Sequence, residues 1–353
     1  MAPAELTLRL TPRARYDVID VTRRVVEEHG ELLGRHARAL YCSYHTTAGY
    51  LEQSLCARLQ YSRQRVDPFI RLFQRLFPPE GPYRHDQLDL RSELSPAERA
   101  SEPKNADSHL AFIGSGLRNC VTYVHRGAPV PAWFIDLDGV VPAGSRQRQT
   151  TVVGYDRETV VAEREVALPV SRHPVDSVNL RDPRLGAFAE LCGWAAGFGL
   201  EHGRLDLALA PGETHVGLTV NEYETLLMQH DLVEVLRDPL RFAAEKGRNM
   251  LRHPLAIPGK TLNYAKYDLV HVFNEAMDAL KMSESAVEKL LSRVLAVPAA
   301  RFLRLKRSVS LRVSGRDPRG PVVCGTYQSP ILVQWRPAAA GQRTLRATLV
   351  ELS

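Results

Sequence analysis

Three histidines in the first half of the chain lie in short polar motifs that could together hold a metal ion. His45 opens the segment His-Thr-Thr-Ala-Gly, His85 lies in Arg-His-Asp, and His109 follows Asn-Ala-Asp-Ser. Each motif predicts a loop, and the apolar run at residues 38–43 predicts a buried strand that leads to His45. Neutral imidazoles are good ligands for borderline divalent metals, and three of them leave positions open for water or substrate. Each histidine alone could be an ordinary surface or core residue, but the three together predict a metal site.

Several neighbours of these histidines could bind a substrate or assist the metal. Thr46 and Thr47 offer hydroxyl groups, and Gly49 would let the backbone approach an anion closely. Asp86 and Asp107 could orient the imidazoles as hydrogen-bond acceptors, or they could cap loops. A metal held in this way could polarise a phosphate or carbonyl oxygen, or lower the pKa of bound water to about 7.

The charge of the chain is compatible with a small anionic substrate. The net charge of +6 at pH 7 comes mainly from scattered arginines, and without a contiguous basic face it does not predict nucleic-acid binding. Arg84 and Arg146 could clamp an anion or could be solvated charges, and Asn105 is a further candidate for ligand binding.

The remaining composition indicates an ordinary globular protein. Of its 353 residues, 44% are apolar and 24% charged, and no apolar run approaches the roughly 20 residues that span a bilayer. Residues 1–6 lack the features of a signal peptide, so we expect a cytoplasmic protein that does not associate with a membrane. The five cysteines contain no Cys-x-x-Cys pair and are expected to be reduced.

The hydrophobic pattern predicts an α+β fold rather than a doubly wound sheet. A helix is expected to begin at Asp20, and residues 51–77 are expected to be mostly helical, with a break or kink at Pro68. The polar segment 85–104 predicts a loop. Strands are predicted at residues 5–10, 37–44, 121–124, 133–137, 150–155 and 204–210.

The second half of the chain repeats landmarks of the first. Gly217 matches Gly49 at an offset of 168 residues (217 − 49), and the pair 252–253 matches Arg84-His85 at the same offset. We therefore predict two copies of one fold, in domains 1–160 and 161–353. Matching Tyr327 to Trp133 gives an offset of 194 (327 − 133), which implies an insertion of about 26 residues in the second copy. Helical patterns place this insertion near residues 267–297, where it would pack against the sheet or cover a cleft.

With these motifs in order, the first half resembles the YjbQ-like family, which is known as a secondary thiamine-phosphate synthase family. The resemblance covers nearly all of residues 5–155 and is weaker over 170–353. Its motifs are Asp20-Val21-Thr22, His45-Thr46-Thr47-Ala48-Gly49, Tyr83-Arg84-His85-Asp86, Ser108-His109 and Arg146-Gln147-Arg148. The resemblance implies a sheet-rich α+β fold, trimeric association of single copies, and a divalent metal on the histidines, without distinguishing Zn from Mg or Mn.

Departures from the family pattern suggest that the two copies share one site. The first copy lacks the family's Asn-Glu pair, whereas the second keeps Asn221-Glu222 and, in Gly-Thr-Tyr-Gln, Gln328. In the second copy Glu213 replaces the first histidine. Our hypothesis is a composite site: the histidines of copy one ligate the metal, and Glu222, as general acid or base, acts with Asn221 and Gln328 from copy two. Alternatively, copy one is the functional unit and copy two a structural partner.

Three functions remain open from the sequence. The first is a metal-dependent enzyme for a phosphorylated or anionic small molecule. By resemblance this includes thiamine-phosphate synthesis, in which a thiazole phosphate displaces pyrophosphate from a pyrimidine diphosphate. The second is a non-catalytic metal- or ligand-binding module, and the third is hydrolysis by metal-bound water. A monomer and a homo-oligomer, either a dimer or a trimer, are both compatible with the chain.

Overall fold

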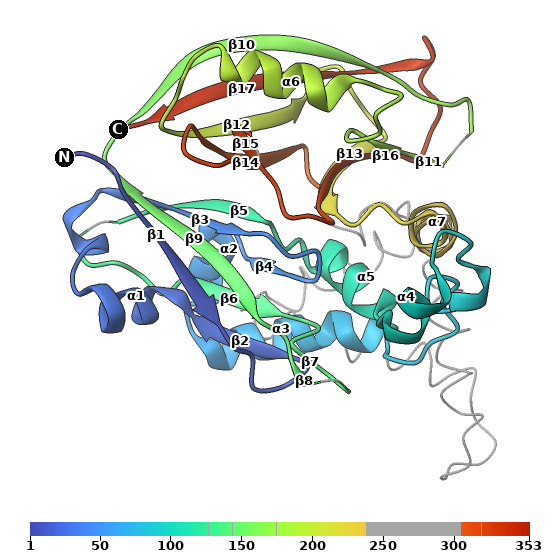
Figure 1. Ribbon diagram of the computed structural model, residues 1–353, viewed down its shortest axis with the longest axis horizontal. Helices are drawn as coiled ribbons and strands as arrows, with labels where there is room; N and C mark the ends of the chain where they lie inside the picture. Colours follow the sequence, from blue (N-terminus) through green and yellow to red (C-terminus); the bar gives the residue numbers. More distant parts are fainter. Residues whose placement is uncertain (126, 143, 174, 238–304, 319) are drawn as a thin grey trace, which may run out of the picture. The chain divides into compact units, whose positions relative to one another are not determined.

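A computed structural model describes residues 1–125, 127–142, 144–173, 175–237, 305–318 and 320–353 of the chain (Figure 1). The helical insertion predicted near 267–297 and the pair 252–253 lie outside these residues. The predicted α+β class is confirmed, because antiparallel sheets and helices occur together. The described residues form two compact units, one of residues 1–56, 116–223 and 305–353, and one of residues 57–115 and 224–237.

The first unit contains a four-stranded and a three-stranded sheet built from the first half of the sequence. Alternating apolar residues of β1 face the core, and the Asp20 carboxylate caps α1 by accepting the Arg23 N–H. The four-stranded sheet has the order β1 (Ala4–Leu10), β9 (Arg148–Tyr155), β3 (Arg38–Ser43) and β5 (Cys120–Val124). The smaller sheet has the order β2 (Asp17–Asp20), β6 (Trp133–Asp136) and β4 (Ala48–Tyr50), and α1 (Val21–His29) follows β2.

The second half of the sequence contributes two sheets with a matching strand order to the same unit. Helix α6 (Ala187–Ala196) packs on the larger sheet through Leu191 and Ala195 (Figure 1). That sheet has the order β10 (Glu158–Pro169), β17 (Gln342–Leu352), β12 (His202–Leu209), β14 (Ser308–Ser314) and β15 (Val322–Val323). The smaller has the order β11 (Asp176–Asn179), β16 (Ser329–Gln334) and β13 (Val216–Asn221). The minor elements of this unit are η1 (Leu33–Arg35) and the ribbon of β7 (Val140–Val141) with β8 (Gly144–Ser145).

Within this unit the two sets of strands share a core. Side chains of β3, β5 and β9 pack against Val350 and Leu352 of β17. At the edge of this cluster the buried Arg312 guanidinium donates to the Glu5 carboxylate at 2.5 Å and to the Tyr44 hydroxyl at 3.0 Å. The Arg312 side chain is buried, whereas Glu5 remains partly open to solvent, so the interaction is only partly shielded from water.

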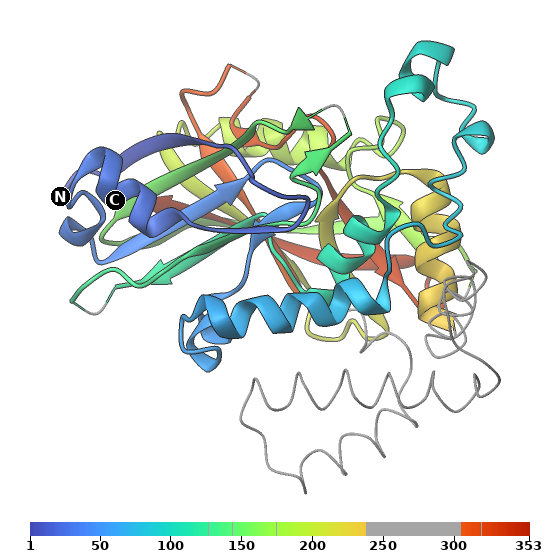
Figure 2. The same cartoon turned by 90° about the horizontal axis from the view of Figure 1, so that it is seen from below.

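The described part of the second unit is helical. Helices α3 and α5 pack together (Figure 2), and Gly114 of α5 permits the approach because a Cβ there would overlap the Phe77 and Phe73 rings. Its elements are α3 (Arg63–Leu76), η2 (Leu88–Leu90), α4 (Pro96–Ser101), α5 (Ala106–Ser115), the π-helical turn η3 (Leu227–Asp231) and α7 (Leu232–Arg237). A short helix α2 (Gln53–Arg58) crosses the boundary between the units. In the described part of the chain, no helix has the length and apolar character needed to cross a membrane.

Three local predictions were wrong. The break in residues 51–77 lies after α2, where Gln60 and Tyr61 adopt positive φ of 55° and 51°, whereas Pro68 lies inside α3. The buried face of α3 keeps the helix continuous through the proline. The segment 85–104 includes α4, which Ser95 opens with a capping box that the sequence reading missed. The third error concerns His109, which lies in α5 rather than in a loop; every residue of that helix is buried.

Candidate functional site

The second unit holds a buried pair of histidines, one of which is oriented by a carboxylate. The His85 and His109 ring centroids lie 5.5 Å apart, and the two residues are 1% and 0% exposed. Nδ1 of His85 lies 2.9 Å from Oδ1 of Asp86, and the same oxygen accepts the backbone N–H of Ala106 at 3.1 Å. An ionised carboxylate only accepts, so Nδ1 carries the proton and Nε2 of the neutral ring is left as the basic nitrogen.

The environment of His85 favours its protonated form. Burial by itself lowers the pKa of His85, but the hydrogen bond and charge of Asp86, together with the charge of Glu224, outweigh it. The pKa of His85 is therefore raised above its usual value of about 6.5. A buried imidazole with a raised pKa and a fixed orientation is suited to giving and taking a proton near neutral pH.

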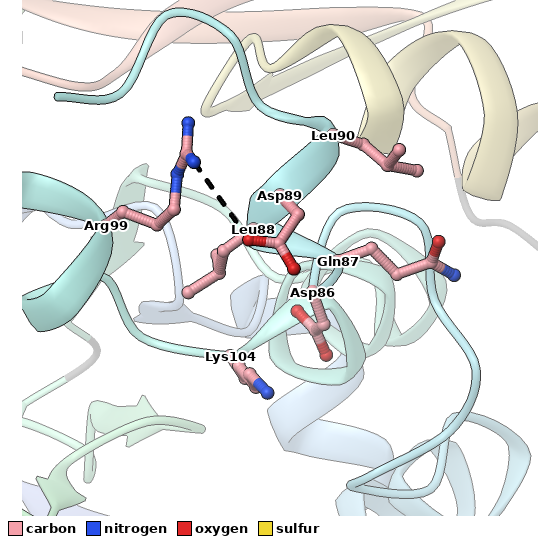
Figure 3. Close-up of a pocket in the computed structure, with 7 residues that line it drawn as sticks. All are labelled: Asp86, Gln87, Leu88, Asp89, Leu90, Arg99 and Lys104. Atoms are coloured by element: carbon pink, nitrogen blue, oxygen red, sulfur yellow. Dashed lines mark ion pairs between the residues drawn. The ribbon is translucent and has the colours of Figure 1, made fainter. Parts of the chain in front are cut away.

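A pocket of about 580 Å³ opens beside this pair, within the same unit. Figure 3 shows its lining, which includes Asp86, so one residue belongs both to the pocket wall and to the His85 pair. Arg99 forms an ion pair with Asp89 at 4.0 Å, and Lys104 adds a second cation to the wall. The lining residues are Asp86, Gln87, Leu88, Asp89, Leu90, Arg99 and Lys104. The exposed Arg84 precedes His85 and lies 3.4 Å from Nδ1 of His230.

His45 belongs to the first unit, and its ring is engaged by the backbone. The N–H of Gln149 donates to Nε2 of His45 at 2.8 Å. Burial, aided by the positive charge of Arg148, lowers the pKa of His45 to about 3. The ring is thus neutral with its proton on Nδ1, and ligation of a metal by Nε2 would require the bond to Gln149 to break.

The other candidates near His45 have structural partners. The buried Arg148 makes a two-pronged ion pair with Asp136 at 2.6 and 2.9 Å, and it also donates to Thr47 Oγ1 at 3.4 Å. Arg146 pairs with Asp138 at 2.8 Å. Gly49 lies in β4 and pairs with Ile135. Each of these interactions joins segments of the first unit. To clamp an anion, Arg146 would have to give up its ion pair with Asp138.

In the second unit, Asn105 positions the start of α5. Its carbonyl accepts the backbone N–H groups of Ser108 and His109, at 3.0 and 3.2 Å. The residue is buried, and through its main chain it helps to fix the helix that carries His109. Its contribution here is to hold a candidate site residue in place.

Two of the second-half candidates reach the His45 loop through its main chain. Gln328 Nε2 donates to the carbonyls of Ser43 and His45 at 3.1 and 2.9 Å, and Asn221 Nδ2 donates to that of Thr46 at 3.2 Å. Glu222 follows Asn221 and is half-buried, with its N–H donated to Asn221 Oδ1. Gln328 and Asn221 thus hold the loop in place, and both were identified from the sequence because they complete motifs missing from the first half.

The three histidines are divided between the two units. His85 and His109 lie side by side in one unit, while His45 belongs to the other. Over the described ranges, the structure has no group of three or more His, Cys, Asp or Glu side chains arranged to hold an ion. Within one unit, His85 and His109 could supply two ligands, and no chemical step is assigned to a metal.

Sequence reasoning missed two carboxylates of the segment after β13. Asp231, fully buried, accepts the backbone N–H groups of Arg84 and His85, and Glu224 accepts those of Leu226 and Leu227. The available signal was an acidic residue within the apolar run Leu-Leu-Met-Gln-His-Asp-Leu-Val, because a carboxylate in an apolar helix needs a buried partner.

Comparisons with known proteins gave matches among solved structures. No family model matches the chain, and no curated protein matches it. A YbjQ-like protein of unknown function from Sulfolobus solfataricus P2 is 14% identical, with a TM-score of 0.28, over 55% of this chain and 99% of its own. A hypothetical protein from Aeropyrum pernix K1 is 18% identical, with a TM-score of 0.27, over 53% and 96%. An uncharacterized conserved protein of the YjbQ/UPF0047 family from Clostridium acetobutylicum is 10% identical, with a TM-score of 0.26, over 54% and 99%.

Proposed function

We propose that the chain is an enzyme that acts on a phosphorylated or otherwise anionic small molecule, with His85 as its acid–base group. The observation that carries this proposal is the buried His85–Asp86 pair, at 2.9 Å, whose carboxylate residue Asp86 also lines a pocket. Burial shields the imidazole from bulk water, and the carboxylate fixes both its tautomer and its orientation.

The residues of the second unit suggest a division of roles. Asp86 would hold the His85 ring and stabilise the imidazolium while Nε2 receives or returns a proton. Lys104 of the pocket wall and the exposed Arg84 would attract and bind the anionic group. General acid–base catalysis of this kind contributes about 10²- to 10⁴-fold to a rate.

The test is a substrate screen followed by substitution of the pair. The screen uses phosphate monoesters and diphosphates, and includes a thiazole phosphate with a pyrimidine diphosphate, because the motif resemblance suggests thiamine-phosphate synthesis. We expect His85→Gln to lower kcat by about 10²-fold or more and Asp86→Asn to lower it less, whereas the exposed His29→Gln serves as a control and should not change it. Full activity of His85→Gln on an identified substrate would refute the proposal.

A second candidate is a metal-dependent enzyme, or a metal-binding module without catalysis. It is favoured by the 5.5 Å separation of the His85 and His109 rings and by the carboxylate on Nδ1 of His85, an arrangement that commonly orients a metal-ligating imidazole. Elemental analysis after reconstitution with Zn²⁺, Mn²⁺ or Mg²⁺ tests it. Near-stoichiometric metal that is lost in both His85→Gln and His109→Gln supports this candidate, and its retention in both eliminates it. If His45→Gln also loses the metal, all three predicted ligands are required.

We also propose that the chain arose by tandem duplication. Support comes from the matching strand orders of the two halves and from the strand register: Gly49 pairs with Ile135 in β6, and Gly217 pairs with Val333 in β16. The same comparison aligns Trp133 with Ile331 rather than with Tyr327. Trp133 pairs with Asp20, the last residue of β2, and Ile331 pairs with Asn179, the last residue of the corresponding strand β11. Expression of residues 1–160 and 161–353 as separate chains tests the idea, since two copies of one fold should reassociate on mixing.

A further inference from the structure

We propose that Asp231 is a positioning residue, supplied by the second half of the sequence, that fixes His85 for its chemistry. This inference rests on the proposed role of His85. Oδ1 of Asp231 accepts the N–H of Arg84 at 2.9 Å, and Oδ2 accepts the N–H of His85 at 3.0 Å. The two oxygens of one carboxylate therefore hold two successive peptide groups.

The burial of Asp231 indicates that these bonds matter. The residue is 0% exposed, and an ionised carboxylate without partners would be costly at such a position. Charge-assisted hydrogen bonds from backbone N–H groups compensate for the lost hydration, and they are shorter and stronger than neutral ones. A pair of such bonds fixes the orientation of the main chain from which the His85 side chain extends.

His85 is thus held at two points by two different carboxylates. Asp231 fixes its main chain, and Asp86 fixes Nδ1 of its ring. With both anchors in place, the position of Nε2 is determined without any contact from a substrate. Removal of the main-chain anchor should leave the His85–Asp86 pair chemically intact but free to shift, and small displacements of a catalytic group are costly to the rate.

The element that carries Asp231 is itself unusual. Asp231 is the last residue of the π-helical turn Leu227–Asp231, and α7 continues from it. Short π-helical turns occur frequently at functional sites. Glu224 caps the start of this helical segment by accepting the N–H groups of Leu226 and Leu227 at 2.8 and 2.7 Å. The turn is therefore anchored at its beginning and presents its final carboxylate to residues 84 and 85.

The contact joins parts of the sequence that are 146 and 147 residues apart. The second half therefore contributes a carboxylate, Asp231, that holds the main chain of the candidate site. Under the offset of 168 residues, the position equivalent to Asp231 in the first half is 63 (231 − 168), where the chain has Arg63. The carboxylate is therefore not repeated at that position.

The test compares Asp231→Asn with Glu234→Gln, an exposed carboxylate substitution on the helix that follows the turn. The amide introduced by Asp231→Asn would offer one acceptor oxygen and would turn an N–H group toward a backbone donor. We expect kcat of Asp231→Asn to fall by about 10- to 100-fold with KM little changed, and Glu234→Gln to behave as wild type. The conservative Asp231→Glu should recover part of the loss, because it retains a two-oxygen acceptor.

A second measurement does not depend on activity. Hydrogen exchange at the amides of Arg84 and His85 should accelerate by about 10-fold or more in Asp231→Asn, because each amide would lose a charge-assisted bond, and should stay unchanged in Glu234→Gln. If exchange accelerates while His85→Gln is fully active, Asp231 positions a residue that is not catalytic, and the proposed function fails separately. Unchanged exchange at both amides, or an unchanged kcat in folded Asp231→Asn, would overturn the positioning role. If Asp231→Asn does not fold, the same two measurements on Asp231→Glu decide the question: a smaller loss of kcat and a smaller acceleration of exchange are then expected, and the absence of both overturns the positioning role.

Discussion

Replacement of Gly325 by alanine should destabilise the first unit, because this glycine touches the His45 loop. A Cβ at position 325 would overlap the backbone carbonyl oxygen of Tyr44. A backbone atom cannot rotate away as a flexible side chain can, so either the turn at 325–328 or the loop must move. That turn is fixed to the loop by Gln328, which donates to the carbonyls of Ser43 and His45.

The loss of stability can be estimated from the contacts that the added methyl group would disrupt. Inserting a methyl group into a closely packed contact costs about 1–3 kcal/mol, and loss of the two Gln328 bonds adds about 0.5–1.5 kcal/mol each. The free energy of unfolding should therefore fall by about 2–6 kcal/mol. For a unit of this size a loss of about 1 kcal/mol lowers Tm by about 2–4 °C, so Tm should fall by at least about 4 °C.

Urea or thermal unfolding followed by circular dichroism measures this change, with Gly193→Ala as the matched control. Gly193 lies in α6 with no atom within 4 Å of a Cβ built there, so alanine should stabilise the helix by up to about 1 kcal/mol. Equal effects of the two substitutions, or a stabilised Gly325→Ala, would refute the close approach of Gly325 to the His45 loop.

Three further perturbations follow from the first unit. The folded-state pKa of His45 is about 3, so the free energy of unfolding of wild type should fall as pH decreases from the unfolded-state pKa of about 6.5 toward 3. His45→Gln can still accept the N–H of Gln149 but cannot be protonated, so unfolding measured at several pH values should show a weaker pH dependence for this variant. Arg148→Met leaves Asp136 buried without its cation and should cost about 3–5 kcal/mol in urea unfolding. Gln328→Ala should cost about 1–3 kcal/mol and speed amide exchange near His45.

Each of these has a result that contradicts it. An identical pH dependence of wild type and His45→Gln would mean that the ring is not held neutral. Arg148→Met together with Asp136→Leu should recover much of the stability lost in Arg148→Met alone, and no recovery would count against the buried pair as its cause. Unchanged exchange around His45 in Gln328→Ala would mean that Gln328 does not hold the loop.

Local patterns in the sequence were sufficient for several strands and for the first helix. The alternating residues 5–10, the apolar run at 38–43 and the cap at Asp20 correspond to β1, β3 and α1, because these signals depend on neighbours a few residues away. The break of residues 51–77 was misplaced at Pro68, since the packing of α3 outweighs the local effect of a proline.

The sequence also named several residues of the candidate site, but not how they are held. It named His45, His85 and His109 by type and spacing, and it named Gln328 and Asn221 because they complete motifs missing from the first half. Their partners depend on tertiary structure.

The tertiary structure decided which of these residues work together. Asp231 is 146 residues from His85, and Gln328 is 283 residues from His45, so no local pattern contains either contact. The packing of the buried helix α5 likewise places the His109 ring beside the His85 ring. The His45 ring instead accepts a backbone N–H. A side chain's type and spacing are local properties of the chain, whereas its hydrogen-bond partners and its protonation depend on the groups that folding brings around it.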